Sequence, residues 1–105
     1  MTRSALPVFV VATALVGAPA LRAAPDVPGG VTFEAGIEYA NPDDQHLQLN
    51  LARPSKGDGP FPAVLCVHGG GFRAGDRKGW DGRCVRLAQE GYVAATVTYR
   101  LAPKY

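Results

Sequence analysis

Excess charge of either sign is missing from this sequence. Lysine and arginine number 11 and aspartate and glutamate number 9, which gives a net charge of +2 over 105 residues. Two of the arginines, Arg3 and Arg22, lie in an N-terminal segment that we expect to be removed, and the remaining charges then balance. A neutral chain lacks the electrostatic attraction on which nucleic-acid-binding proteins depend, so we expect no nucleic-acid partner. With 47% hydrophobic and 19% charged residues, the chain is instead typical of a single folded domain.

A hydrophobic run long enough to cross a membrane is also missing. The longest apolar stretch, residues 5–16, contains a proline and follows a positively charged start at Arg3. Small residues then continue to Ala24 and include an A-x-A pattern at residues 18–20, which is typical of a cleavable secretory signal. We therefore expect residues 1–24 to be a signal peptide; the alternative is an uncleaved amphipathic or anchor helix. The mature protein is expected to be secreted or periplasmic, without a stable membrane anchor.

Cysteine is scarce, with only Cys66 and Cys84 present. In an exported protein these two residues could form a disulfide. Cys66 lies in an apolar segment typical of a strand, and Cys84 lies in a segment with helical spacing. This placement favours two buried, unpaired thiols over a disulfide.

The first half of the mature chain predicts a linker and a hairpin. Residues 25–32 contain prolines and glycines without hydrophobic periodicity, which is typical of a linker. Apolar residues typical of β-strands follow at 36–40, and polar and apolar residues alternate at 46–51. The turn residues at 41–44 join these two segments, so we expect an antiparallel hairpin.

The second half predicts a parallel βαβ unit. Apolar strands are expected at 63–67 and 92–99, and a helix over 81–90 between them. Asp81 is the expected N-cap of this helix and Gly91 its C′ residue. The fold class is therefore α/β, with an antiparallel hairpin followed by a parallel βαβ unit in one mixed sheet. A single helix leaves one sheet face uncovered, so we expect residues 33–105 to be the N-terminal portion of a larger domain.

A glycine-rich turn, His68-Gly69-Gly70-Gly71-Phe72, follows the 63–67 strand. Consecutive glycines allow backbone N–H groups to point at an anion. The turn fits the G-x-G-x-x-A pattern of dinucleotide-binding proteins, in which Arg100 could face a 2′-phosphate. Three further glycines delay the helix that such a site requires, however, and nicotinamide cofactors are scarce outside the cytosol. An oxyanion hole is the second interpretation. A plain tight turn is the third, but it requires neither the histidine nor the aromatic residue.

Two motifs favour the oxyanion hole because together they resemble one family. The glycine turn with Gly75-Asp76, and Tyr99-Arg100-Leu101-Ala102-Pro103 after the next strand, resemble the α/β-hydrolase esterases of the hormone-sensitive-lipase-like group and their carbohydrate-esterase relatives. Residues 45–51 resemble the second strand of these proteins, so the resemblance covers about residues 33–105. It also implies the strand order: the hairpin, then the 92–99 strand, then the 63–67 strand.

The resemblance assigns roles to the residues of the glycine turn. It implies that the N–H groups of Gly70 and Gly71 stabilise an oxyanion. Phe72 is expected to be a packing residue, and the alternative is that it lines a substrate pocket. The resemblance implies no cofactor and no metal. Supporting roles are expected for three further residues: His68 and Gly69, which hold the loop, and Asp76, which either ties down the loop or caps the following helix.

The G-x-S-x-G nucleophile motif of this fold is missing from the chain. Ser4 lies in the signal segment and Ser55 lies in a loop, so neither has the strand-turn-helix setting of a catalytic serine. We therefore expect no catalytic residue in these 105 residues and a catalytic triad further downstream. The whole protein is expected to be a carboxylesterase, lipase or carbohydrate acyl-esterase acting on a small-molecule or carbohydrate ester. The alternative is a non-catalytic, hydrolase-like binding module.

Overall fold

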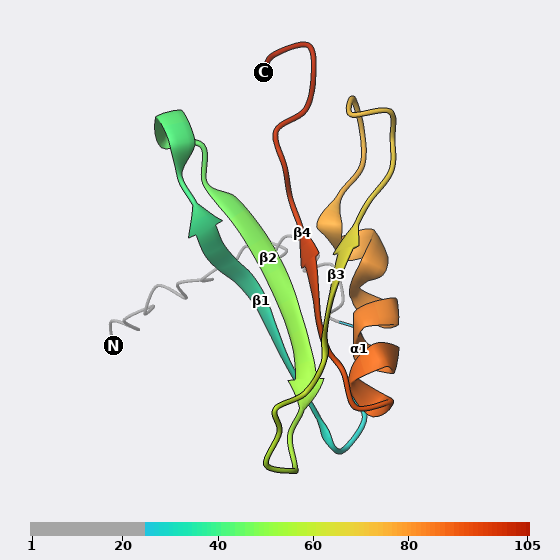
Figure 1. Ribbon diagram of the computed structural model, residues 1–105. Helices are drawn as coiled ribbons and strands as arrows, with labels where there is room; N and C mark the ends of the chain where they lie inside the picture. The colour runs from blue at the N-terminus through green and yellow to red at the C-terminus, as the bar shows by residue number, and fades with distance from the viewer. Residues whose placement is uncertain (1–24) are drawn as a thin grey trace, which may run out of the picture.

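A computed structural model describes residues 25–105 and contains the expected hairpin (Figure 1). Strands β1 (Val31–Ala40) and β2 (Leu47–Pro54) pair antiparallel across the short 3-10 turn η1 (Pro42–Asp44). Strand β1 begins at Val31, inside the segment expected to be a linker, and runs through Gly36, where we expected the strand to begin. The pairing shifts register between Glu34 and Ile37, and Gly36 has a φ of +73° there. This bulge lets the strand continue on both sides of the glycine. The predicted signal peptide lies outside the described residues.

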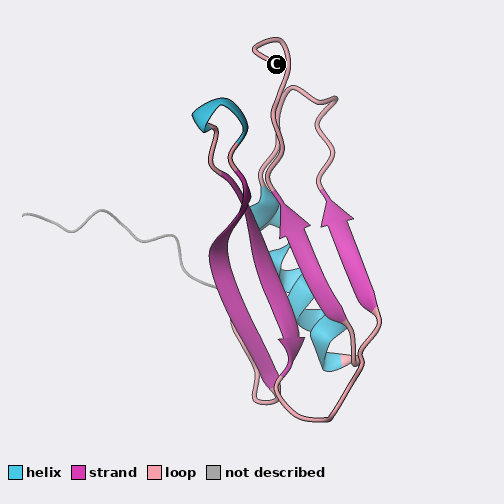
Figure 2. Cartoon of the chain, turned by 60° about the vertical axis from the view of Figure 1, so that its left-hand side comes forward, coloured by secondary structure: helices cyan, strands magenta, loops and turns pink. Residues whose placement is uncertain are grey.

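The βαβ unit follows as predicted. It consists of β3 (Ala63–Val67), the 3-10 turn η2 (Arg77–Trp80), helix α1 (Asp81–Gln89) and β4 (Val93–Val97). Strand β4 pairs parallel with β3 and antiparallel with β2. The sheet order is β1-β2-β4-β3, with α1 packed on one face (Figure 2). The predicted mixed α/β architecture is therefore confirmed.

The two ends of α1 differ in how well they follow the expectation. The N-cap position is Trp80 and not Asp81, so the prediction for Asp81 is wrong. Asp81 is the first helical residue, and its buried carboxylate accepts a hydrogen bond from Asn50 Nδ2 at 2.8 Å. That partner on β2 draws the carboxylate toward the sheet rather than over the helix end. At the other end, Gly91 has the φ of +94° expected for a C′ glycine, and its N–H donates to the Ala88 carbonyl.

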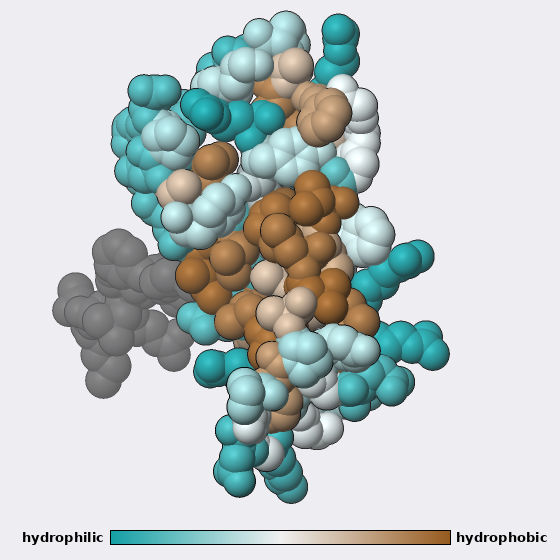
Figure 3. Space-filling model, viewed as in Figure 1, coloured by the Kyte–Doolittle hydropathy of each residue, from teal (hydrophilic) through white to brown (hydrophobic). Residues whose placement is uncertain are grey.

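The core lies between α1 and one face of the sheet. Its buried members include Ala52 and Ala94 from the sheet and Val85 and Ala88 from the helix. The opposite face is also apolar, and Figure 3 shows these side chains gathered over the middle of the sheet. On that face the edge strand β3 exposes 62% of Leu65 and 51% of Val67. Within residues 25–105, no helix has the length and apolar character needed to cross a membrane.

Both cysteines are free and buried, as predicted, between β3 and α1. Burial raises the pKa of the Cys84 thiol from 9.0 to about 12, and the neighbouring Cys66 and Asp81 act in the same direction. The neutral thiol is therefore favoured in the folded state. Because unfolding restores the lower pKa, the resulting stabilisation is complete below pH 9 and is lost progressively as the pH rises toward 12.

The raised pKa predicts slow alkylation of Cys84. At pH 9, iodoacetamide is expected to modify Cys84 about 10²–10³-fold more slowly in the folded protein than in the urea-unfolded chain, because the thiolate fraction is smaller by that factor. The rate should increase about tenfold per pH unit above pH 9. Mass spectrometry of the alkylated peptide measures it, with the unfolded chain as control. Equal rates in the folded and unfolded protein would contradict the placement of this thiol.

Candidate functional site

The glycine-rich turn leaves the carboxyl end of β3 and returns to η2. Its tight bend is closed by the N–H groups of Arg73 and Ala74, which donate to the Gly70 carbonyl at 3.1 and 3.2 Å. Gly70 and Gly71 have φ values of +129° and +63°. A Cβ atom on Gly70 would lie 1.9 Å from the Ala74 carbonyl oxygen, so only glycine fits at this position. The geometry of the bend therefore requires glycine at position 70 and favours it at position 71, where φ is positive.

The bend leaves backbone donors exposed. Among residues 25–105, no protein acceptor is found for the N–H groups of Gly70 and Gly71, and both residues are exposed. They lie beyond the carboxyl end of a parallel strand, which is where α/β sheets bind their ligands. Adjacent free N–H groups at such a position can stabilise a negative charge. The ring of Phe72, 72% exposed, lies on the same bend.

The His68 side chain contacts the backbone of this bend. Its side chain is buried, and Nδ1 lies 2.8 Å from the Gly69 carbonyl oxygen. The imidazole stacks on the ring of Tyr99, with 4.3 Å between the ring centroids and 14° between the planes. The Tyr99 hydroxyl donates to the His68 carbonyl oxygen at 2.7 Å. The two sequence motifs that carry the family resemblance are thus in direct contact.

Asp76 has the second of the two roles considered for it. Its carboxylate accepts a hydrogen bond from the Lys78 N–H at 2.7 Å and so caps the 3-10 turn η2. This hydrogen bond lies within η2, so Asp76 is linked to the glycine turn only through the backbone at Gly75. A Cβ atom on Gly75 would lie 2.1 Å from His68 Nδ1, so this glycine is what lets the returning chain pass close to the imidazole.

A polar cluster beneath η2 was not anticipated from the sequence. The guanidinium group of Arg77 donates to Asn50 Oδ1 at 2.9 Å, to Thr98 Oγ1 at 2.8 Å and to Gln48 Oε1 at 3.0 Å. Asn50 is 1% exposed, and its Oδ1 also accepts from the Gly36 N–H at the β1 bulge. The cluster joins η2 to β2 and to the chain after β4, and it fixes the returning limb of the glycine turn. The polar residues at alternate positions 48 and 50 of β2 were the only sequence signal for it.

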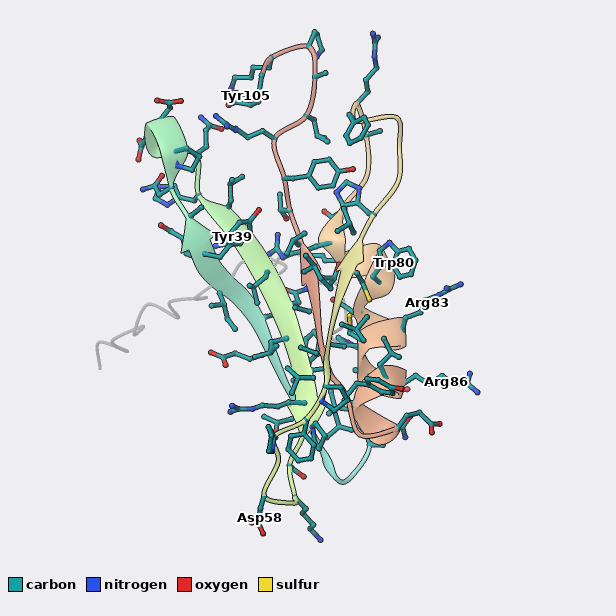
Figure 4. All side chains as sticks on the ribbon, in the orientation of Figure 1. Tyr39, Asp58, Trp80, Arg83, Arg86 and Tyr105 are labelled. Carbon is teal, nitrogen blue, oxygen red and sulfur yellow. The ribbon has the colours of Figure 1, made fainter. Side chains whose placement is uncertain are left out.

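The outer side of η2 and α1 carries a separate pocket, whose lining includes Trp80, Arg83 and Arg86. Figure 4 shows Trp80, Arg83 and Arg86 on the outer side of η2 and α1, away from the hairpin, and the Arg83 guanidinium lies over the Trp80 ring at 4.9 Å. Trp80 is half-buried and packs against the core. Within the described part of the chain, no group of three or more histidine, cysteine, aspartate or glutamate side chains is placed to hold a metal ion.

Comparison with known proteins gives consistent matches. The BD-FAE family model matches residues 49–105, which is more than half of the chain and includes both motifs. Gut esterase 1 of Caenorhabditis elegans is 37% identical over 57 residues, which are 52% of this chain and 10% of that protein. Esterase B from Lactobacillus rhamnosis has a TM-score of 0.62 and 37% identity, over 75% of this chain and 26% of that one. A bacterial heroin esterase has a TM-score of 0.57 and 33% identity, over 73% of this chain and 25% of that one.

These matches confirm the resemblance seen in the sequence. The chain spans about a quarter of the length of the two solved esterases and a tenth of gut esterase 1. Its four strands and helix correspond to the N-terminal part of the esterase α/β-hydrolase fold. The chain belongs to the BD-FAE family of esterase-type α/β-hydrolases.

Proposed function

We propose that the whole protein carrying this chain is an exported serine ester hydrolase, and that the chain supplies its oxyanion hole through the N–H groups of Gly70 and Gly71. The observation that carries the proposal is the bend at these glycines. Both positions have a positive φ, and Gly70 has no room for a Cβ atom. This backbone conformation leaves two adjacent N–H groups exposed beyond the end of β3. Acyl transfer places negative charge on a carbonyl oxygen, and two such donors stabilise it.

The remaining chemistry requires residues outside this chain. A serine attacks the ester carbonyl, a histidine takes its proton, and a carboxylate orients the histidine. None of this requires a metal or cofactor. Two similar esterases have been solved with organophosphorus inhibitors: esterase B with a tributyrin phosphonate, and Thermogutta terrifontis esterase 2 phosphonylated by sarin. Modification by such inhibitors supports nucleophilic catalysis by the whole protein, and we propose a carboxylic ester of a small molecule or carbohydrate as its substrate.

Ester turnover by the complete protein tests this proposal. We expect the complete protein to hydrolyse p-nitrophenyl acetate or butyrate and to be inactivated by a phosphonate that attaches to one serine. Residues 25–105 alone are expected to do neither, because they contain no catalytic triad. A folded complete protein that neither turns over esters nor reacts with the phosphonate would instead favour a non-catalytic binding module. Phosphonate attached within residues 25–105 would contradict the assignment of the nucleophile to a downstream segment.

Export predicts where the mature chain begins. Cleavage between Ala20 and Ala24 would leave a protein that starts near Ala24 or Pro25 and is recovered from the periplasm or medium. N-terminal sequencing of the protein purified from its native host measures this start. A cytosolic protein beginning at Met1 or Thr2 would contradict export.

A further inference from the structure

We propose that Tyr99 is the positioning residue of the glycine turn: it holds the His68 imidazole with its proton on Nδ1, and His68 thereby fixes the direction of the Gly70 N–H. The catalytic consequence of this proposal rests on the proposed oxyanion hole. The structural consequence does not, because it concerns a tautomer and a backbone orientation that are measured directly.

Tyr99 reaches His68 because their strands are neighbours. Val67 on β3 pairs with Val97 on β4, so the chain segments that follow these parallel strands leave the sheet side by side. Tyr99 and His68, 31 positions apart in sequence, meet there with their rings stacked. The contact continues further along the turn: the Ala102 N–H donates to the Phe72 carbonyl at 2.7 Å, and the Phe72 ring lies edge-on to Tyr99 at 6.2 Å. The second motif therefore supports both ends of the bend.

The hydrogen bonds around His68 determine which ring nitrogen carries the proton. The Tyr99 O–H is used in its bond to the His68 carbonyl oxygen, which can only accept. Nδ1 lies 2.8 Å from the Gly69 carbonyl oxygen, another pure acceptor, and 3.3 Å from the Tyr99 oxygen. A ring nitrogen facing two acceptors must be the donor. Nδ1 is therefore protonated, and in the neutral imidazole Nε2 carries the lone pair.

A rigid peptide unit transmits this contact to the proposed oxyanion donor. The Gly69 carbonyl and the Gly70 N–H belong to the same planar trans peptide, so they point in opposite directions. The Nδ1–H bond that holds the carbonyl toward His68 consequently turns the N–H away from it, toward the exposed side of the bend. Without that bond, glycines on both sides of the peptide leave its orientation free. Tyr99 acts one step further back by orienting the imidazole.

Replacing Tyr99 by phenylalanine removes the hydroxyl and keeps the ring stack. In the complete protein we expect Tyr99→Phe to lower kcat about tenfold, as the loss of one such hydrogen bond implies, with KM changed less than about twofold. The backbone amide NMR signals of Gly70 and Gly71 should shift or broaden, because the Gly69–Gly70 peptide is no longer held in one orientation. The ¹⁵N NMR spectrum should show His68 in the Nδ1–H form in the wild type and in a mixture of tautomers in the variant. Tyr92→Phe, at a half-exposed tyrosine away from the bend, is the matched control.

Two further variants separate positioning from simple packing. His68→Asn keeps an N–H donor at the same distance along the side chain as Nδ1, whereas His68→Gln moves it one bond outward. We expect the asparagine variant to retain most of the kcat and the wild-type Gly70 amide signal, and the glutamine variant to lose both. Wild-type Gly70 and Gly71 amide signals and an unchanged tautomer in Tyr99→Phe would overturn the proposal. If the wild-type complete protein hydrolyses no ester, the proposed function fails, but the NMR results still decide the role of Tyr99.

Discussion

Replacing Gly71 by proline in the complete protein is expected to lower kcat about 10²–10³-fold, the usual cost of losing one oxyanion donor. Proline removes the N–H, and its ring fixes φ near −65°, whereas the bend has +63° at this position. KM should change far less, because the donor acts on charge that develops in the transition state. Steady-state kinetics with a p-nitrophenyl ester measure both constants, and circular dichroism checks that the variant is folded.

Two alanine variants serve as controls for this loss. Gly71→Ala keeps the N–H and meets no atom within 4 Å, so it adds only the strain of a positive φ, about 1–2 kcal/mol, and a smaller loss of kcat. Gly79→Ala lies in η2, outside the bend, and should behave as the wild type. A folded Gly71→Pro enzyme with kcat within a few-fold of the wild type would contradict the oxyanion role.

Local patterns were sufficient to predict the order of the elements. Short runs of β-branched or apolar residues indicated β1, β3 and β4, polar and apolar alternation indicated β2, and Gly91 marked the end of α1. The position of β4 between β2 and β3 came from the family resemblance and is confirmed. Local sequence could not have given it, because strand order depends on contacts between residues that are far apart in the chain.

The alternation in β2 predicted a strand but not which face the helix covers. Leu49 and Leu51 point to the face opposite α1, whereas Asn50 and Ala52 are the buried residues of this strand. Polarity alone would have placed Asn50 on the solvent side. Asn50 is buried because Arg77 and Asp81, more than 25 positions later in the chain, supply its hydrogen bonds.

The same limit explains the outcome for Asp81. An aspartate before a helical run is the usual N-cap. Asp81 is instead the first residue of the helix, and its carboxylate is directed at the sheet, where it accepts a hydrogen bond from the side-chain amide of Asn50. The glycine turn, by contrast, was predictable, because consecutive glycines are a local signal for backbone with positive φ. Its contact with Tyr99 was not, because it depends on the parallel register of β3 and β4.

The Arg77 cluster leads to the largest expected effect on stability. Replacing Arg77 by methionine keeps much of the side-chain volume and removes three hydrogen bonds, to Asn50, Thr98 and Gln48. We expect the free energy of unfolding to fall by about 3 kcal/mol, because bonds from a charged donor are lost and their acceptors are left without that partner. Urea unfolding of the complete protein, followed by fluorescence, measures the change.

Two arginine substitutions decide whether the geometry of the cluster is responsible. Arg77→Lys keeps the charge, but an ammonium group cannot reproduce the planar fork that reaches three separate oxygens, so most of the loss should remain. Arg86→Met removes an exposed arginine from α1 and should change stability by less than about 0.5 kcal/mol. If Arg77→Lys were as stable as the wild type, charge alone would account for the effect. If Arg77→Met were as stable as Arg86→Met, the cluster would contribute nothing to the fold. The expected order, with both Arg77 variants well below Arg86→Met, would show that the fork itself ties η2 to β2 and to the chain after β4.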